Sequence, residues 1–273
     1  MDSATYYQHS GRVGITTPAY YCVFGFTAVI ALSIFYGFIT SKAPIIYMNF
    51  IFLVMYSMAI GLVVSKCSIM GKVRNIKIAI CVGLLFSCIG HYFAWVTWFI
   101  SFNSISSEIF LSFKVLTQVA NLANEGSWAM FGWHPPAAFY FMAWGAELLI
   151  TAVTVSVLIL KNLQIPFCEQ CKSWIDIESC ITPLPHIKYP SELVSQLESG
   201  DLSYLNTIKR LTHFESKHSE IIIRHCKNCQ GMYLMDINMV ILPDTHANQK
   251  LQCIPVVQNI HIDRKMYDTI VSL

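Results

Sequence analysis

Charged side chains are scarce in this chain. Asp, Glu, Lys and Arg together make up 12% of its 273 residues, whereas hydrophobic residues make up 55%. Soluble globular domains carry about 25% charged residues, so this composition excludes an ordinary soluble protein and indicates a membrane protein. The charges are also unevenly distributed, because residues 1–165 hold 8 basic and 4 acidic side chains and residues 166–273 hold 10 and 12. We therefore predict a membrane domain over residues 1–165 and a domain in water over residues 166–273.

Motifs that identify a reaction are absent as well. The sequence has no phosphate-binding glycine loop, no Gly-x-Ser-x-Gly nucleophile elbow and no His-Glu-x-x-His metalloprotease motif. Residues 166–273 lack a basic stripe and carry more acidic than basic side chains, so nucleic-acid binding would lack its main electrostatic contribution. The sequence therefore favours a protein that is not an enzyme, assigns no catalytic residue and predicts no nucleic-acid partner.

Four apolar windows stand out instead. They are residues 19–39, 44–64, 78–100 and 139–160. Apart from His91 in the third window and Glu147 in the fourth, they contain no charged residue. At about 1.5 Å per residue, each window is long enough to cross a hydrocarbon core of about 30 Å. We predict four transmembrane helices, because helices buried in a large soluble protein would need a polar shell that this chain lacks.

The orientation in the membrane follows from one short loop. The connection between the second and third windows carries four basic residues: Lys66, Lys72, Arg74 and Lys77. Basic loops face the cytoplasm, and an even number of spans then puts both termini on that side. We predict an integral membrane protein with both termini in the cytoplasm, in the inner membrane if the source is bacterial.

Small residues recur four apart within the windows. The pairs are Ser33/Gly37, Gly61/Ser65 and Gly83/Ser87. Because lipid provides no hydrophobic drive between helices, close approach at small residues stabilises their packing. We expect these pairs to face neighbouring helices.

Three polar residues occur inside the windows at similar depth. Counted from the outer helix ends at about 1.5 Å per residue, His91 and Glu147 share a depth, and Asn49 is slightly shallower. Polar groups at this depth mark a ligand site or a proton or ion relay, or they form a polar clasp that fixes helix register. Since no second acidic group continues a path, the clasp is favoured, and the three residues are kept as ligand or relay candidates.

The long third loop has a helical pattern of its own. Five of its apolar residues recur at spacings of three and four: Ile109, Phe113, Leu116, Ala120 and Ala123. This pattern predicts an amphipathic helix that lies on the outer membrane interface.

The polar region contains two Cys-x-x-Cys pairs, Cys168/Cys171 and Cys226/Cys229. Four thiols in two such pairs are the ligand set of a structural zinc site. The alternatives are thiol exchange, which needs a low-pKa thiolate in a βαβ setting that neither pair has, and unliganded cysteines. A cytoplasmic location supports metal binding, since thiols there stay reduced.

The pattern around these cysteines predicts a small α+β domain. Residues 191–197 and 202–211 have the spacing of two short helices broken at Gly200, whereas residues 220–224, 232–242 and 252–262 have the pattern of strands. The motifs CEQC and CKNC, the latter between two strands, resemble the knuckles of a zinc ribbon. This resemblance implies a zinc ion held by Cys168, Cys171, Cys226 and Cys229. The 54 residues between the pairs would then contain a helical insertion.

The expected fold is thus an α-helical membrane bundle of four transmembrane helices and one interfacial helix, followed by a zinc-ribbon-like cytoplasmic domain. The favoured function is a multi-pass membrane protein whose zinc-stabilised domain binds a cytoplasmic protein partner, as an anchor, sensor or assembly factor. One alternative is a small transporter or channel that uses Asn49, His91 and Glu147. Another is a membrane thiol oxidoreductase. The expected partners include the lipid bilayer, and the sequence is also compatible with an oligomer.

Overall fold

The computed structural model describes residues 6–43, 46–103, 117–118, 121, 136–175, 179–201, 207, 210–213, 215–229, 231–242 and 252–271. The chain divides into two compact units. One is Ser10–Gln164, and the other is Ile165–Leu273 together with residues 6–9. That they fold as independent domains, with the boundary at residue 165, stays a prediction.

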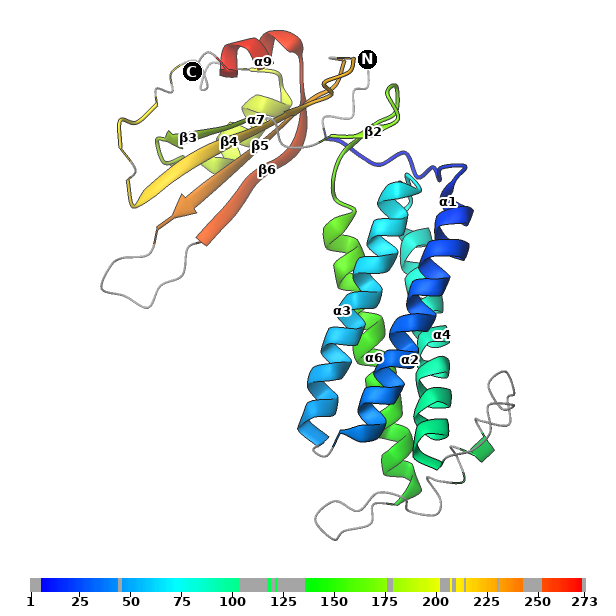
Figure 1. The fold of residues 1–273 in the computed structure, drawn as a ribbon. Coiled ribbons are helices and arrows are strands. Elements are labelled where there is room, and N and C mark those ends of the chain that lie inside the picture. Colours follow the sequence, from blue (N-terminus) through cyan, green and yellow to red (C-terminus); the bar gives the residue numbers. More distant parts are fainter. Residues whose placement is uncertain are drawn as a thin grey trace. The chain divides into compact units, whose positions relative to one another are not determined.

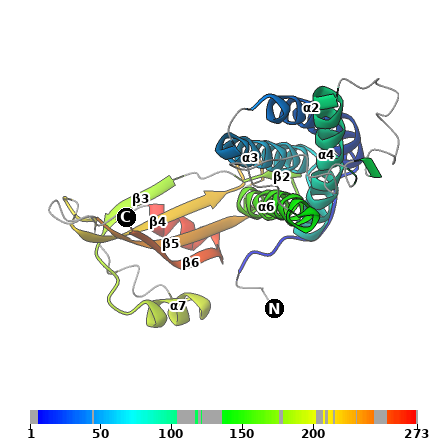
Figure 2. The same cartoon turned by 90° about the horizontal axis from the view of Figure 1, so that it is seen from below.

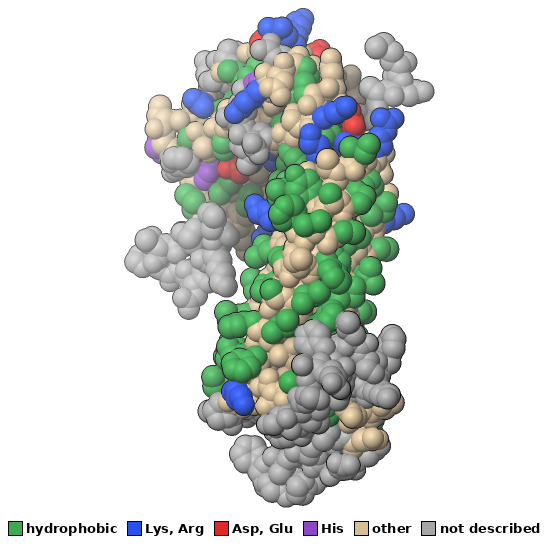
Figure 3. All heavy atoms as spheres, turned by 45° about the vertical axis from the view of Figure 1, so that its right-hand side comes forward, with side chains coloured by type: hydrophobic (Ala, Val, Ile, Leu, Met, Phe, Trp, Pro, Cys, Tyr) green, Lys and Arg blue, Asp and Glu red, His purple; other side chains and the backbone are tan. Residues whose placement is uncertain are grey.

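Within the described residues, four helices are long and apolar enough to cross a membrane, as the hydropathy of the sequence predicts. The first, Thr17–Lys42, begins as α1 (Thr17–Ala19), passes through a π-helical stretch (Tyr20–Gly25) and continues as α2 (Phe26–Lys42). The others are α3 (Ile46–Met70), α4 (Ile76–Asn103) and α6 (Ala137–Asn162). Figure 1 shows them side by side, and Figure 2 shows the same bundle turned by 90°. Green hydrophobic side chains cover much of the helical face visible in Figure 3, as contact with lipid requires.

Small residues lie where these helices approach each other most closely. A Cβ atom at Gly37 on α2 would collide with the backbone carbonyl oxygen of Ala94 on α4. At Gly61 it would lie 2.7 Å from a Leu158 side-chain carbon, and at Gly83 2.6 Å from one of Ile159. The expected small-residue contacts are therefore present. Side-chain hydrogen bonds also join the helices, such as the one between Ser57 and Thr151 at 2.9 Å.

We predict that Gly37→Ala destabilises the bundle by roughly 1–3 kcal/mol, because α2 must move away from a backbone atom that cannot rotate aside. The matched control is Gly145→Ala on α6, where an added Cβ meets no described atom within 4 Å. Thermal unfolding of the purified full-length chain in detergent measures both. Equal midpoints for the two variants would contradict this packing.

The second unit contains a four-stranded antiparallel sheet in the order β3-β4-β5-β6. Its strands are β3 (Ser179–Leu184), β4 (Lys217–His225), β5 (Tyr233–Ile241) and β6 (Gln252–Ile262). The strands expected from residue 232 and from residue 252 are present, and β4 extends the expected run in both directions. The sequence pattern missed β3, because Pro183 interrupts it. Proline is tolerated there since β3 is an edge strand with an irregular register between Ile181 and Leu184.

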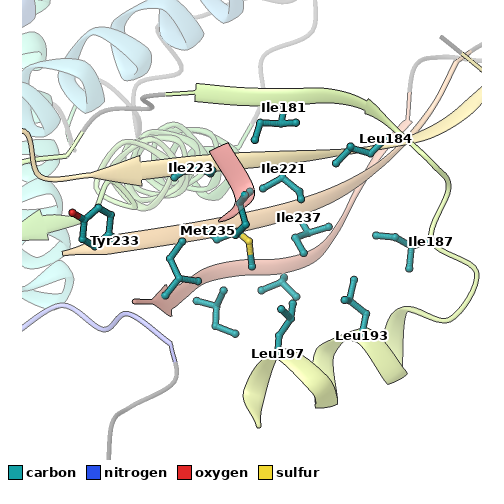
Figure 4. Packing of buried hydrophobic residues seen from close by; sticks show 14 residues of the cluster. Ile181, Leu184, Ile187, Leu193, Leu197, Ile221, Ile223, Tyr233, Met235 and Ile237 are labelled. Atoms are coloured by element: carbon teal, nitrogen blue, oxygen red, sulfur yellow. The ribbon is translucent and has the colours of Figure 1, made fainter. Parts of the chain in front are cut away.

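One face of the sheet is covered by helix α7 (Pro190–Glu198) and by helix α9 (Arg264–Val271) at the end of the described chain. Leu193 and Leu197 of α7 and Ile270 of α9 join the buried strand residues in a single apolar core. Figure 4 shows Leu193 and Leu197 directed towards the sheet, beside Ile237 and Met235. The helix expected over residues 191–197 is therefore present, and Gly200 just beyond it has a φ of +79°, which favours glycine.

Two smaller elements complete this unit. A short hairpin pairs β1 (Phe167–Cys168) with β2 (Ser173–Trp174). Near the N-terminus, Tyr6 forms a bridge to Ile260 of β6, and the backbone N–H of Tyr7 donates to the Asn259 carbonyl at 2.8 Å. These first described residues therefore pack on the edge strand.

Two expectations fall on residues that the structure does not describe. Most of the expected interfacial helix over residues 109–123 lies outside the described residues. So does most of the second short helix expected over residues 202–211.

Candidate metal centre

The four predicted cysteines lie together. Cys168 and Cys171 belong to the β1–β2 hairpin, and Cys226 and Cys229 belong to the turn between β4 and β5. All four sulfur atoms lie within 4.8 Å of one another, and those of Cys168 and Cys229 are 3.6 Å apart. Tetrahedral zinc with Zn–S bonds of about 2.3 Å separates its sulfur ligands by about 3.8 Å, so this cluster has the size that a metal ion requires.

In each Cys-x-x-Cys pair, a turn of the backbone brings the two thiols close together. The hairpin turns sharply at Lys172, whose φ of +52° lies in the left-handed region, so that Cys168 pairs with Ser173. The Ile175 N–H then donates to the Pro166 carbonyl at 2.9 Å and closes the base of the hairpin. At the second pair, the Cys226 N–H donates to the Met232 carbonyl at 3.1 Å. Two closed turns therefore present two thiols each.

The cluster is shielded from water on one side. Cys168 and Cys226 are each 3% exposed and pack with Ile175, while Met232 packs against them. Cys171 and Cys229 are half-buried. Four protein thiols around one centre leave no coordination position for a substrate, which is typical of a structural site and not of a catalytic one.

The pKa values of the cysteines differ within the cluster and show which thiol loses its proton most readily. Burial raises the pKa of the Cys226 thiol, but the backbone N–H groups of Cys229 and Asn228 and the thiols of Cys168 and Cys171 outweigh burial and lower this pKa to about 6. The Cys229 thiol, with burial, raises the pKa of Cys171 to about 12. Burial also raises the pKa of Cys168. The protein groups thus favour the Cys226 thiolate and disfavour the Cys168 and Cys171 thiolates, which a bound cation would stabilise.

The segment between the two pairs differs in part from the expected helical insertion. It contains α7, but also the strands β3 and β4, so it contributes half of the sheet. The second unit is therefore a mixed α+β structure with a four-cysteine cluster at one end of β4.

The three polar residues of the membrane bundle are only partly brought together. Asn49 and Glu147 line one pocket, which His91 does not line. The ring of His91 is 3% exposed and lies 5.9 Å from the Tyr56 ring and 6.2 Å from the Trp95 ring, measured between centroids. Among the described residues, no hydrogen bond joins His91 to Glu147 or to Asn49. Trp95, Trp98 and Trp144 line the same pocket as Asn49 and Glu147.

Comparison of the chain with models of protein families, with curated proteins and with solved structures found no match. The fold and the site themselves define the class, a multi-pass membrane protein with a four-cysteine site that could bind a metal ion.

Proposed function

We propose that this is a non-enzymatic membrane protein whose second unit is stabilised by a structural zinc ion, lies in the cytoplasm and binds a protein partner as an anchor, sensor or assembly factor. The observation that carries the proposal is the four-cysteine cluster, whose sulfur atoms all lie within 4.8 Å of one another. A closed site of this kind stabilises a fold and offers no position for chemistry.

Zinc is the metal that best suits the donor set. Four thiolates in tetrahedral arrangement select zinc or iron, and hard cations such as calcium and magnesium prefer oxygen ligands. Zinc has no redox chemistry, which agrees with a structural role. The ion would be held by Cys168, Cys171, Cys226 and Cys229, and it would supply the positive charge that four thiolates need.

The charge of the second unit supports a protein partner. Residues 166–273 carry 10 basic and 12 acidic side chains, which disfavours a nucleic acid. The sheet face opposite the apolar core carries polar groups, among them Glu220 and Asn238. Contacts between proteins that are not permanently joined are more polar than permanent ones.

A thiol oxidoreductase receives less support. The lowered pKa of Cys226 is the property such an enzyme needs, but reactive cysteines are partly exposed and Cys226 is 3% exposed. Its pKa is also lowered partly by the thiols of the opposite pair, an arrangement suited to shared metal binding.

Metal analysis combined with labelling from each side of the membrane tests the proposal. We expect one zinc per purified chain. In sealed vesicles, an impermeant maleimide at mildly alkaline pH should label Cys180 and Cys253, the exposed thiols of the second unit, from the cytoplasmic side alone. The alkaline pH is needed because burial and the Glu220 carboxylate raise the pKa of both thiols.

The control for this labelling is the double variant Cys180→Ser/Cys253→Ser, which should lose the cytoplasmic label. The clustered thiols should react only after a chelator is added. Visible absorption from bound iron, the absence of metal, or labelling from the outer side would each contradict the proposal.

A further inference from the structure

A pocket lies between the four long helices, in the half of the bundle away from the connection between α3 and α4. Each helix contributes to it, and its cavity volume is about 50 Å³. The lining residues that matter most are Tyr36, Asn49, Trp95, Trp98, Trp144 and Glu147. Three of the six tryptophans of the chain thus surround one small space.

The aromatic rings of this pocket are held in place by their neighbours. Trp95 of α4 and Trp144 of α6 contact each other with ring centroids 5.6 Å apart at 52°. Tyr36 is stacked on Tyr56 at 4.4 Å and 9°. Rings fixed in this way form a wall that exists before any ligand arrives, which reduces the entropy lost on binding.

The pocket also contains one carboxyl group that can carry a negative charge. Glu147 is the single charged side chain among the described lining residues, which include no Lys or Arg. The Oδ1 atom of Asn49 is buried and has no hydrogen-bond partner in the described part of the chain. The faces of indole and phenol rings add negative potential, because the aromatic quadrupole is negative there. A carboxyl group buried at this depth is ionised only when a cation pairs with it, and the described lining provides no such cation.

We propose that this pocket binds an organic ammonium group, with Glu147 as the countercharge and Trp95, Trp98 and Trp144 as the cation–π wall. A methylated ammonium fits best, because it gains more from aromatic faces than from hydrogen-bond acceptors, and four of the eight described lining residues are aromatic. This site is independent of the proposed zinc site and adds a ligand to the proposed function.

Other occupants suit the lining less well. A metal cation such as calcium needs about six to eight oxygen ligands. Only four of the described lining residues have side-chain oxygens: Tyr36, Thr40, Asn49 and Glu147. A proton relay needs a second titrating group in contact with Glu147, and His91 does not line the pocket. An anion would be repelled by the carboxylate.

The test is a titration of the purified full-length protein with tetramethylammonium chloride. Tryptophan fluorescence monitors the titration, and a parallel titration with sodium chloride of equal ionic strength provides the correction. We expect a saturable change in emission. The neutral, isosteric Glu147→Gln variant should raise the apparent dissociation constant at least tenfold. Trp95→Leu, which keeps the carboxylate, should weaken binding through the aromatic wall alone.

Ser156→Ala on α6 is the matched control, since the described Ser156 hydroxyl bonds only within its own helix, to the Ala152 carbonyl. It should bind like the wild type. No saturable change, or equal affinity in wild type and Glu147→Gln, would overturn the proposal. If Glu147→Gln does not fold, as judged by size-exclusion chromatography, Trp95→Leu decides in its place.

The ammonium group has two sources, a free small cation or the choline head group of a phospholipid. Nanodiscs of phosphatidylglycerol and of phosphatidylcholine separate them. A response in both lipids supports a free cation, and a response confined to phosphatidylglycerol supports a choline lipid that occupies the site. The absence of a fluorescence response in both lipids overturns the proposal.

Discussion

Replacing Cys226 with serine is expected to reduce the zinc content of the purified full-length protein from one ion per chain to near zero. Cys226 is 3% exposed, and its sulfur interacts with the thiols of Cys168 and Cys171 and with the backbone N–H groups of Cys229 and Asn228. A hydroxyl at this position cannot supply the thiolate that zinc requires. Elemental analysis after gel filtration measures the loss.

The same variant should lose the structure around the cluster. Metal binding contributes about 10–16 kcal/mol in small zinc-binding peptides, which is comparable to the whole stability of a typical domain. The β1–β2 hairpin depends on it most, because its two strands are two residues long each and Cys168 and Ile175 pack against the other cysteines. We expect the hairpin to become sensitive to protease in Cys226→Ser and in wild type treated with a chelator.

Cys180→Ser provides the matched control for the metal. Cys180 is exposed on edge strand β3, and its sulfur lies 3.9 Å from a Glu220 oxygen. This variant should keep its zinc and its protease resistance. A protein partner should co-purify with the wild type and with Cys180→Ser, but not with Cys226→Ser. Full zinc content in Cys226→Ser would show that these thiols do not form the site.

Asp236→Ala is expected to destabilise the second unit by about 3 kcal/mol. Asp236 Oδ2 accepts a hydrogen bond from Arg224 at 2.6 Å, and its Oδ1 accepts from the backbone N–H of Asn259 at 2.6 Å. The two charged side chains are 16% and 10% exposed, so solvent screens them only weakly. Truncation would leave a poorly solvated guanidinium with one described acceptor, the Asn259 side-chain oxygen at 3.1 Å.

This carboxylate also holds the local backbone between β5 and β6. Asn259 has a φ of +54°, and the register of the two strands shifts between Met235 and Asn238. A backbone conformation that costs energy persists only when its surroundings stabilise it, and Asp236 does so here. The loss should therefore exceed that of a surface ion pair, which contributes at most about 1 kcal/mol.

Urea unfolding of the full-length protein, followed by circular dichroism, measures this change. Asp268→Ala on α9 is the control, because Asp268 is exposed, and its effect should stay within about 0.5 kcal/mol. Arg224→Met combined with Asp236→Leu should recover part of the stability, since no charge is then left unpaired. Similar unfolding of Asp236→Ala and Asp268→Ala would contradict this role of the ion pair.

Local sequence patterns predicted many of the elements. Four apolar windows were enough for the membrane helices, because a span depends on the composition of one continuous segment. Alternating residues likewise predicted β6, whose bounds agree with the expected strand. The patterns failed where a strand is short or interrupted, as in the two-residue strands β1 and β2 and in β3 with its Pro183.

The two candidate sites differ in how much of each could be predicted from the sequence alone. The spacing of each cysteine pair is local, so the ligand types were predictable, although 54 residues separate the pairs and only the fold brings their sulfur atoms together. In the bundle, counting residues predicted a shared depth for His91 and Glu147. Depth does not determine the direction in which a side chain points around the helix axis, and helix packing decides that direction.

The sequence by itself therefore determined the four helices, the polar second unit and the thiols available to a metal, because composition and spacing act within one segment. The tertiary structure decided that Asn49 and Glu147 share an aromatic pocket while His91 lies against Tyr56. It also decided that two distant turns form one cluster. These outcomes depend on contacts between segments far apart in the chain, and packing alone fixes those contacts.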